Sequence, residues 1–250
     1  SFENVIGGAM GDTITGNSLD NLLAGGPGND TYAFDADGPL GSDTLDESGG
    51  GIDTLSFSAT TTQSVAVDLA SGAAQAVNGN LTLNLQAGDT FENVIGGSLA
   101  DTIRNNGLAN SLTGGPGNDT YVFDADSALG SDTLNEAGGG IDTLDFSPTT
   151  AEAVAVNLAL SAAQAINANL TLTLGSTTTF ENVIGGAMGD AIVGNTLANS
   201  LTGGPGDDTL TGGSGNDTYP FDADSLLGSD TLNESGGGAD TLDFSATTSN

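Results

Sequence analysis

The stretch that decides the fold is "GGPGNDTY" at residues 25–32, which returns at 114–121 and, as "GGSGNDTY", at 212–219. Glycine loses more conformational freedom on folding than any other residue, but it adopts positive φ without strain. Three glycines within four positions therefore indicate a loop of defined backbone shape. Asp30 lies where this loop leads into the β-like run "TYA".

Around this stretch, an Asp or Asn recurs every nine residues. The residue two positions after each of them is apolar or aromatic, which predicts short strands stacked around a narrow core. The series are Asp12, Asn21, Asp30; Asp101, Asn110, Asp119; and Asp190, Asn199, Asp208, Asp217. The apolar residues are Ile14, Leu23, Tyr32, Ile103, Leu112, Tyr121, Ile192, Leu201, Leu210 and Tyr219. The third series holds one additional nonapeptide, which a solenoid accommodates by adding one strand and one turn.

A longer repeat encloses the shorter one. "FENVIGG" begins at Phe2, Phe91 and Phe180, an interval of 89 residues. We therefore expect one continuous solenoid with repeat units 1–90, 91–179 and 180–250, the last partial, belonging to a longer array. The alternating "VAVDL" (65–69) and "NLTLNL" (80–85) predict half-buried strands. They form either wider coils of the solenoid or a protruding hairpin.

Four nonapeptides fit the pattern G-G-x-G-x-D-x-U-x, in which U is a large apolar residue: 25–33, 114–122, 203–211 and 212–220. The chain thus resembles the RTX, or haemolysin-type calcium-binding, repeats. The resemblance implies an all-β fold, a right-handed parallel β-roll or β-solenoid in which two nonapeptides complete one coil. It also implies that calcium lies between successive turns on the same side, bound by the sixth-position carboxylates and by carbonyls of the glycine loop.

Carried over residue by residue, the resemblance assigns metal ligands to complete and to incomplete loops. The complete loops are Gly25, Gly26, Gly28, Asp30; Gly114, Gly115, Gly117, Asp119; Gly203, Gly204, Gly206, Asp208; and Gly212, Gly213, Gly215, Asp217. Asp12, Asp101 and Asp190 match at the sixth position only, while Asn21, Asn110 and Asn199 offer an amide. Further ligands are expected at the more widely spaced Asp43, Asp53, Asp132, Asp142, Asp230 and Asp240.

The chemistry of the side chains independently favours calcium. The chain has 33 acidic residues, a single basic one, Arg104, and neither Cys nor His, for a net charge of −32. Ca²⁺ prefers six to eight oxygen ligands, whereas soft or borderline metals prefer Cys or His. Stacked carboxylates about 5 Å apart repel by roughly 3 kcal/mol per pair at an effective dielectric constant of 20. We therefore expect several calcium ions and a disordered metal-free chain.

The two-turn coil makes a geometric prediction, because consecutive turns alternate sides. Asp12, Asp30 and Asp53 should share one edge, opposite Asn21 and Asp43; in the second repeat Asp101, Asp119 and Asp142 lie opposite Asn110 and Asp132. The additional nonapeptide swaps the edges in the third repeat. There Asp190, Asp208 and Asp230 should lie opposite Asn199, Asp217 and Asp240.

Three groups of residues have alternative interpretations. The "FDAD" runs, with Asp35, Asp37, Asp124, Asp126, Asp222 and Asp224, complete a metal site or form a solvated loop. Glu47, Glu136 and Glu234 before the triple glycines are structural or secondary ligands. The Thr that follows nearly every turn Asp is a good β-former on a wet face, or part of an ice-binding ladder.

Composition also restricts the function. The negative charge argues against nucleic acid or an anionic membrane surface as a partner, and no apolar run is long enough for membrane insertion. Without Cys, His or Lys we expect no enzyme. We expect a calcium-binding structural region of a large secreted bacterial protein, such as a filament, surface-layer or adhesin stalk, with self-association. It would be extracellular or at the cell surface, exported by a type I route. The alternative is a calcium-dependent secretion and folding module of an exported enzyme or toxin, with an ice-binding solenoid ranked lower.

Overall fold

The computed structural model describes residues 2–86, 90–136 and 138–248, and these residues contain 25 strands and no helix. The chain forms two compact units. Unit 1 comprises residues 1–120 and 137–140, and unit 2 comprises residues 121–136 and 141–250. The three repeat units expected above remain a division of the sequence. The all-β, parallel architecture is the one expected from the nonapeptides.

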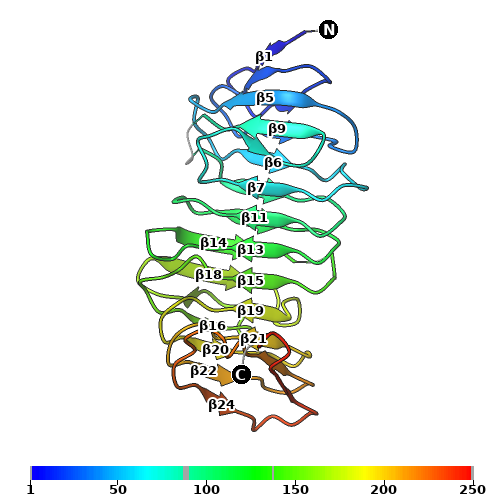
Figure 1. Ribbon diagram of the computed structural model, residues 1–250. Coiled ribbons are helices and arrows are strands. Elements are labelled where there is room, and N and C mark those ends of the chain that lie inside the picture. Colours follow the sequence, from blue (N-terminus) through cyan, green and yellow to red (C-terminus); the bar gives the residue numbers. More distant parts are fainter. Residues whose placement is uncertain (1, 87–89, 137, 249–250) are drawn as a thin grey trace. The chain divides into compact units, whose positions relative to one another are not determined.

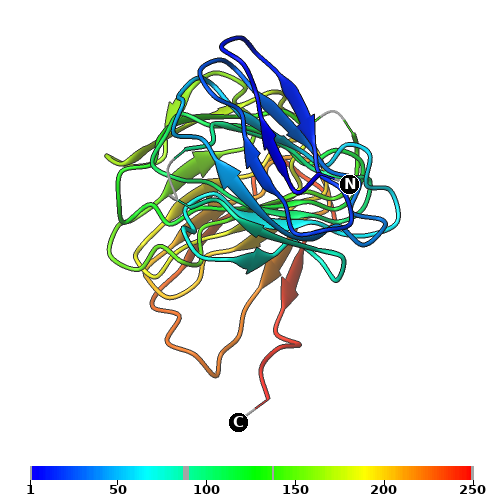
Figure 2. The ribbon, with the colours of Figure 1, turned by 90° about the horizontal axis from the view of Figure 1, so that it is seen from above.

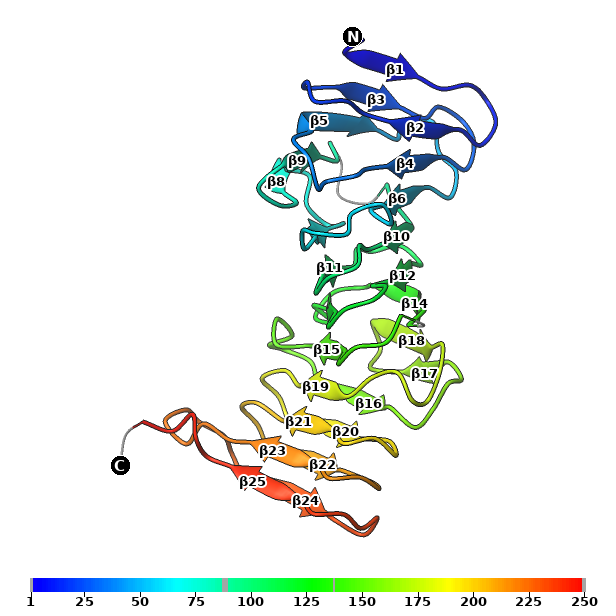
Figure 3. The same cartoon turned by 90° about the vertical axis from the view of Figure 1, so that its right-hand side faces the viewer.

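In unit 1 the strands are stacked in columns, each strand pairing with the strand one full coil later (Figures 1 and 3). The first column is β1 (Asn4–Ile6), β3 (Leu22–Ala24), β5 (Gly41–Asp46) and β9 (Leu81–Asn84), with β8 (Gln75–Ala76) beside β9. The second is β2 (Thr13–Thr15), β4 (Thr31–Ala33), β6 (Thr54–Ser56), β10 (Asn93–Ile95) and β12 (Ser111–Thr113). A third holds β7 (Ala66–Asp68) and β11 (Thr102–Arg104). Loops at the strand ends connect the columns (Figure 2).

Unit 2 repeats this arrangement. Its longest column contains β13 (Thr120–Val122), β15 (Thr143–Asp145), β19 (Asn182–Ile184), β21 (Ser200–Thr202), β23 (Thr218–Pro220) and β25 (Thr241–Asp243). The others are β14 (Gly130–Leu134), β18 (Leu170–Leu174) and β17 (Gln164–Ala165), and β16 (Ala155–Asn157), β20 (Ala191–Val193), β22 (Thr209–Thr211) and β24 (Thr231–Asn233). Figure 3 shows β19, β21, β23 and β25 side by side with β20, β22 and β24.

The strand register confirms that two nonapeptides complete one coil. Asn4 pairs with Leu22, and Thr13 pairs with Thr31, both in parallel and both 18 residues apart. The coils that contain the longer loops are wider, because Leu22 pairs with Thr44. Every second strand therefore lies on the same side of the coil.

The alternating segments outside the nonapeptide pattern lie within the parallel columns. β9 pairs in parallel with β5 and ends the first column, whereas β7 pairs in parallel with β11 and begins the third. A short antiparallel ladder joins β8 to β9. The wider-coil interpretation is thus correct for β7 and β9. The hairpin interpretation holds for the short β8 and, in unit 2, for β17, which pairs antiparallel with β18.

The core contains the inward-facing residues that the nine-residue period predicted. All ten apolar residues two positions after the turn Asp or Asn are buried, with at most 4% of their surface exposed. Aromatic pairs join successive coils within each unit. Phe34 stacks on Phe57 with ring centroids 5.7 Å apart, and Phe123 stacks on Phe146 at 5.4 Å. Such pairs add packing energy beyond the area that they bury.

Candidate metal centre

The turn aspartates of unit 1 form hydrogen-bonded ladders along two edges of the coil. The Asp12 amide donates to Asp30 Oδ1 at 2.7 Å, and the Asp30 amide donates to Asp53 Oδ1 at 2.8 Å. On the other edge, the Asn21 amide donates to Asp43 Oδ1 at 2.9 Å. The predicted separation of the two edges is confirmed, and it follows from the two-turn coil.

The third repeat, in unit 2, confirms the predicted swap of edges. The Asp190 amide donates to Asp208 Oδ1 at 2.7 Å, and the Asp208 amide donates to Asp230 Oδ1 at 3.0 Å. Asn199, Asp217 and Asp240 are linked in the same way on the other edge, at 2.8 and 3.0 Å. The additional nonapeptide is half a coil, so everything that follows it changes sides.

The complete and incomplete loops differ in their backbone φ angles. In complete loops the second and fourth residues have positive φ, for example Gly26 at 88° and Gly28 at 148°. In the incomplete loops the fourth position is Met10 or a similar bulky residue, and among the described residues none of these has positive φ. A side chain at this position excludes the left-handed conformation that glycine allows, so the incomplete loop folds differently.

This difference decides which carboxylate oxygens have partners. In incomplete loops the loop itself caps the turn residue: the Gly186 amide donates to Asp190 Oδ2 at 2.6 Å, and the Asn17 amide donates to Asn21 Oδ1 at 2.8 Å. The amides of Gly8 and Gly97 do the same for Asp12 and Asp101. By contrast, no hydrogen-bond donor reaches the buried Oδ2 atoms of Asp30, Asp43, Asp208 and Asp217.

Backbone carbonyls surround the same loops at close range. A Cβ added to Gly26 would lie 2.5 Å from the Gly8 carbonyl oxygen, and one added to Gly25 would collide with Asp30 Oδ2. Cβ atoms at Gly49 and Gly51 would collide with the carbonyls of Gly26 and Gly28. The glycines therefore let successive loops approach so closely that carbonyl oxygens and free carboxylate oxygens face the same narrow spaces.

Three acidic side chains meet in unit 1. One carboxylate oxygen from each of Asp30, Glu47 and Asp53 lies within 4.8 Å of the other two, and all three residues are buried. Glu47 has 6% of its surface exposed, and neither of its oxygens has a hydrogen-bond donor. At 4.8 Å and an effective dielectric constant of 20, each charged pair repels by roughly 3.5 kcal/mol.

Unit 2 contains an equivalent group at Asp217, Glu234 and Asp240, of which the two latter residues are exposed. The Tyr219 hydroxyl donates to Glu234 Oε1, as the Tyr121 hydroxyl does to Glu136 Oε1. A Cβ at Gly212 would collide with Asp217 Oδ2 and lie 2.5 Å from both Glu234 Oε1 and the Tyr219 hydroxyl. The same residue types thus converge in both units.

Burial makes the charged forms of several of these groups unfavourable. It raises the pKa of Glu47 to about 8, with Asp53 and Asp30 adding to the rise. Burial likewise raises the pKa of Asp43 and of Asp208 to about 6. It also raises the pKa of the Tyr32 hydroxyl, and the adjacent Glu47 adds to this. The chain's single basic residue cannot neutralise these clusters.

The remaining predicted positions fall into three classes of exposure. Asp12 and Asp230 are half-buried, and Asp240 is exposed. The others have at most 2% of their surface exposed: Asp30, Asp43, Asp53, Asp101, Asp119, Asp132, Asp142, Asp190, Asp208 and Asp217. Buried carboxylates are costly unless they are paired or bound to a metal.

Sequence reasoning missed one member of the ladder. The Asp53 amide donates to Glu92 Oε2 at 2.7 Å, and the Asp142 amide donates to Glu181 Oε2 at 2.9 Å. Both are the Glu of "FENVIGG", which thereby takes the place of a turn Asp where the chain passes from one repeat to the next. The repetition of this Glu with the motif was the available signal.

The "FDAD" runs act as loop caps. Asp37 accepts hydrogen bonds from the Thr61 amide and hydroxyl and from the Thr62 amide, at 2.8 to 3.0 Å. These bonds, the Thr62 amide first, lower the pKa of Asp37 to about 2. Asp126 and Asp224 bind Thr150 and Thr248 in the same way. The solvated-loop interpretation is therefore closer to the structure, although the Asp binds a neighbouring loop.

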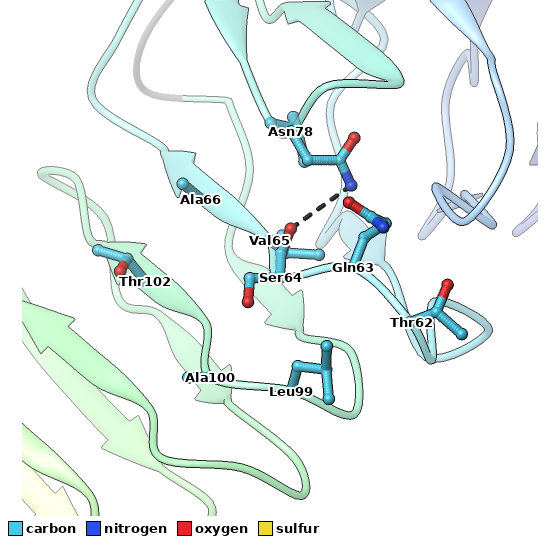
Figure 4. Close-up of a pocket in the computed structure, with 10 residues that line it drawn as sticks. Thr62, Gln63, Ser64, Val65, Ala66, Asn78, Leu99, Ala100 and Thr102 are labelled. Carbon is cyan, nitrogen blue, oxygen red and sulfur yellow. Dashed lines mark hydrogen bonds between the residues drawn. The ribbon is translucent and has the colours of Figure 1, made fainter.

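A pocket in unit 1 offers no comparable chemistry (Figure 4). It lies beside β7 and is lined by Thr62, Gln63, Ser64, Leu99 and Ala100, among others, with no charged side chain. The Asn78 side-chain amide donates to the Ser64 carbonyl at 3.4 Å at its rim. The carboxylate clusters are therefore the centres with distinctive chemistry.

These clusters fit calcium. They provide hard oxygen ligands from carboxylates and carbonyls, in loops whose geometry varies, and that is the donor set that Ca²⁺ prefers. A divalent cation would supply the partner that the buried, unpaired oxygens of Asp30, Asp43 and Glu47 lack. It would also offset the repulsion between them.

Comparison with known proteins gives two family matches. The model described as "Peptidase M10 serralysin C terminal" matches residues 44–137 and 133–250, and "RTX calcium-binding nonapeptide repeat (4 copies)" matches residues 6–38. A search of curated proteins found no match. Among the described residues, no helix could cross a membrane.

Proposed function

Because this chain belongs to the family of the serralysin C-terminal domain and carries RTX calcium-binding repeats, we propose that it is an extracellular structural region that folds when it binds calcium. The observation that carries the proposal is the row of buried carboxylate oxygens without partners along both edges of the coil. Such oxygens destabilise a metal-free chain and become ligands when calcium is present.

The two loop types suggest how the ligands are divided. The carboxylates of the complete loops, represented by Asp30, Asp208 and Asp217, would bind calcium through their unpaired Oδ2 atoms, together with carbonyls of the adjacent glycine loops. Asp43 would act likewise. Asp12, Asp101 and Asp190 would mainly cap their own loops, because their Oδ2 already accepts an amide hydrogen bond.

Within this proposal the region acts as a stiff extender, in a filament, a surface layer or an adhesin stalk, and copies self-associate. Calcium is millimolar outside cells, so the chain would stay unfolded before export by a type I route and fold afterwards. No catalytic role is proposed, because every carboxylate cluster described above is accounted for by the repeat. Nucleic acid and anionic membranes are disfavoured as partners by the charge of −32.

A second candidate is favoured by the serralysin match: a calcium-dependent secretion and folding module of an exported enzyme. Refolding of a fused passenger domain separates the two. A module should accelerate refolding of the passenger when calcium is added, whereas an extender should leave the rate unchanged. The ice-binding alternative ranks below both, because the threonine column Thr13, Thr31 and Thr54 ends at Asn93.

Circular dichroism with and without calcium tests the main proposal. The chain in chelator should be largely unstructured, and millimolar calcium should produce the β signal. Magnesium and zinc are the controls, because Mg²⁺ demands a stricter octahedral geometry and Zn²⁺ prefers His or Cys. Full β structure in chelator, or folding by zinc at lower concentration than by calcium, would overturn the proposal.

A further inference from the structure

Glu47 and Glu234 occupy equivalent positions in the two units. Each is the last residue of a "DTLDE" or "DTLNE" run, precedes a triple glycine and lies in a cluster with two turn aspartates. We infer that each of them completes a three-carboxylate cation site that binds Ca²⁺, or a trivalent lanthanide, more tightly than the positions on the opposite edge of the same coils. This inference rests on the proposed function and assigns a ligand outside the nonapeptide pattern.

The buried side chains indicate a ligand and not merely a surface charge. Asp30 is fully buried and Glu47 is 94% buried, and Asp30 Oδ2 and both Glu47 oxygens have no donor. Gly25 faces both side chains, since an added Cβ would collide with Asp30 Oδ2 and lie 2.7 Å from Glu47 Oε1. The cluster is therefore a space enclosed by carboxylate oxygens and bounded by a residue that must lack a side chain.

On the opposite edges the described residues bring no three carboxylate oxygens within 4.8 Å of one another. In unit 1 a Cβ at Gly16 would lie 2.9 Å from Asn21 Oδ1 and from Asp43 Oδ2, so one amide and one carboxylate meet there. In unit 2, Asp208 belongs to no group of three carboxylates within the described residues. Because the number of charged ligands sets the affinity of calcium sites, the sites that contain Glu47 and Glu234 should fill first.

Tyrosine supplies a local reporter for these sites. The chain has three tyrosines and no tryptophan. The Tyr219 hydroxyl donates to Glu234, and the Tyr32 hydroxyl is buried against Glu47. Terbium bound beside either ring should emit when the tyrosine is excited, whereas terbium on the opposite edges should emit less. A Tyr121→Phe background restricts the signal to the sites that contain Glu47 and Glu234.

The experiment compares Glu47→Gln and Glu234→Gln with Glu152→Gln, which removes the same charge from an exposed loop. Each test variant should raise the terbium concentration at half-maximal emission from its own site by about tenfold. Equilibrium dialysis at the calcium concentration that half-fills these sites in the parent chain should show fewer bound ions for each. Glu152→Gln should match the parent in both assays. Glu234 is exposed, so its substitution leaves the buried core unchanged and keeps the test valid if Glu47→Gln does not fold.

Two outcomes distinguish this inference from the proposed function. If calcium folds the parent chain but the Glu47 and Glu234 variants retain its terbium midpoint and its number of bound ions, the three-carboxylate sites do not exist and the proposed function stands. If calcium does not fold the parent chain, the proposed function fails. Equal losses in Glu152→Gln would also overturn the inference, because the effect would then be one of net charge.

Discussion

Substituting Asn for Asp30 and for Asp12 should have different effects, although both residues lie on one edge and both changes remove one negative charge. Asp12 Oδ2 already accepts the Gly8 amide, and an Asn oxygen can keep that bond, as Asn21 does in the same type of loop. Asp30 Oδ2 has no donor and faces Glu47 and Asp53. We therefore expect Asp12→Asn to be nearly neutral and Asp30→Asn to alter the response to calcium.

The structure sets the size and sign of the Asp30 effect. Neutralising Asp30 removes its repulsion with Asp53 and with the ionised form of Glu47, about 3.5 kcal/mol for each charged pair at the 4.8 Å limit of their separation and an effective dielectric constant of 20. The metal-free chain should therefore become more ordered. In calcium the same change removes a charged ligand, which should weaken the site by about tenfold, or about 1.4 kcal/mol. The substitution should thus act in opposite directions without and with calcium.

The assay is a calcium titration followed by circular dichroism, starting in chelator. Asp30→Asn should begin with more β signal than the parent chain and reach its midpoint at about tenfold higher calcium. Asp12→Asn should follow the parent curve within about twofold. Equal midpoint shifts in the two variants would show that the unpaired oxygen does not identify the ligand. A drop in β signal for Asp30→Asn in chelator would show that repulsion does not limit the metal-free state.

Three further predictions concern pH, a loop and a cap. The folded-state pKa values of Glu47, about 8, and Asp43, about 6, exceed the values for unfolded chains. The stability that these groups add is therefore complete below about pH 4 and is lost as the pH rises through 6 to 8. The β signal in chelator should grow on acidification. A β signal that does not change with pH would contradict this. Gly28→Ala places a Cβ 2.6 Å from the Met10 backbone at a φ of 148°, and it should lower the free energy of unfolding by at least about 2 kcal/mol. The control Gly38→Ala places its Cβ in open space and should change the free energy of unfolding by less than about 0.5 kcal/mol. Similar urea midpoints for the two variants in calcium would refute the loop argument. Thr60→Val removes the hydroxyl that accepts a hydrogen bond from the buried Ala36 amide at 3.0 Å. The free energy of unfolding should fall by about 1–3 kcal/mol in the same urea assay, and an unchanged urea midpoint would contradict this.

The parts of the fold that could be predicted from sequence depend on local periodicity. A nine-residue step places an apolar residue such as Leu23 inward and a residue such as Asp30 in a turn, and it does so in every repeat. Two such steps complete one coil, and this defines which turns share an edge. These consequences follow from strand geometry and require no knowledge of distant contacts. They include the edge swap after residues 203–211, because inserting half a coil has only one geometric result.

The parts that could not be predicted depend on contacts between distant residues. Glu92 reaches the Asp53 amide 39 residues earlier in the chain, a distance that no nonapeptide count supplies. The cluster of Asp30, Glu47 and Asp53 requires the path of the triple-glycine loop. The capping of Asp12 could have been anticipated in part, since Met10 stands where a complete loop needs positive φ.

Because the additional nonapeptide in the third repeat is half a coil, the face on which later residues lie depends on whether an odd or an even number of nonapeptides has been inserted. In unit 1 the tyrosine of "NDTY", Tyr32, lies in the column of β2, which is not the column of the "FENVIGG" strand β1. In unit 2 the strand that contains Tyr219 pairs with β21, so it lies in the same column as the "FENVIGG" strand β19. Gaining or losing one nonapeptide therefore carries every later cluster, long loop and aromatic pair to the opposite face, while gaining or losing two restores the original face. An array of such repeats can reverse the side that it presents to a partner without changing any residue in the presented segment.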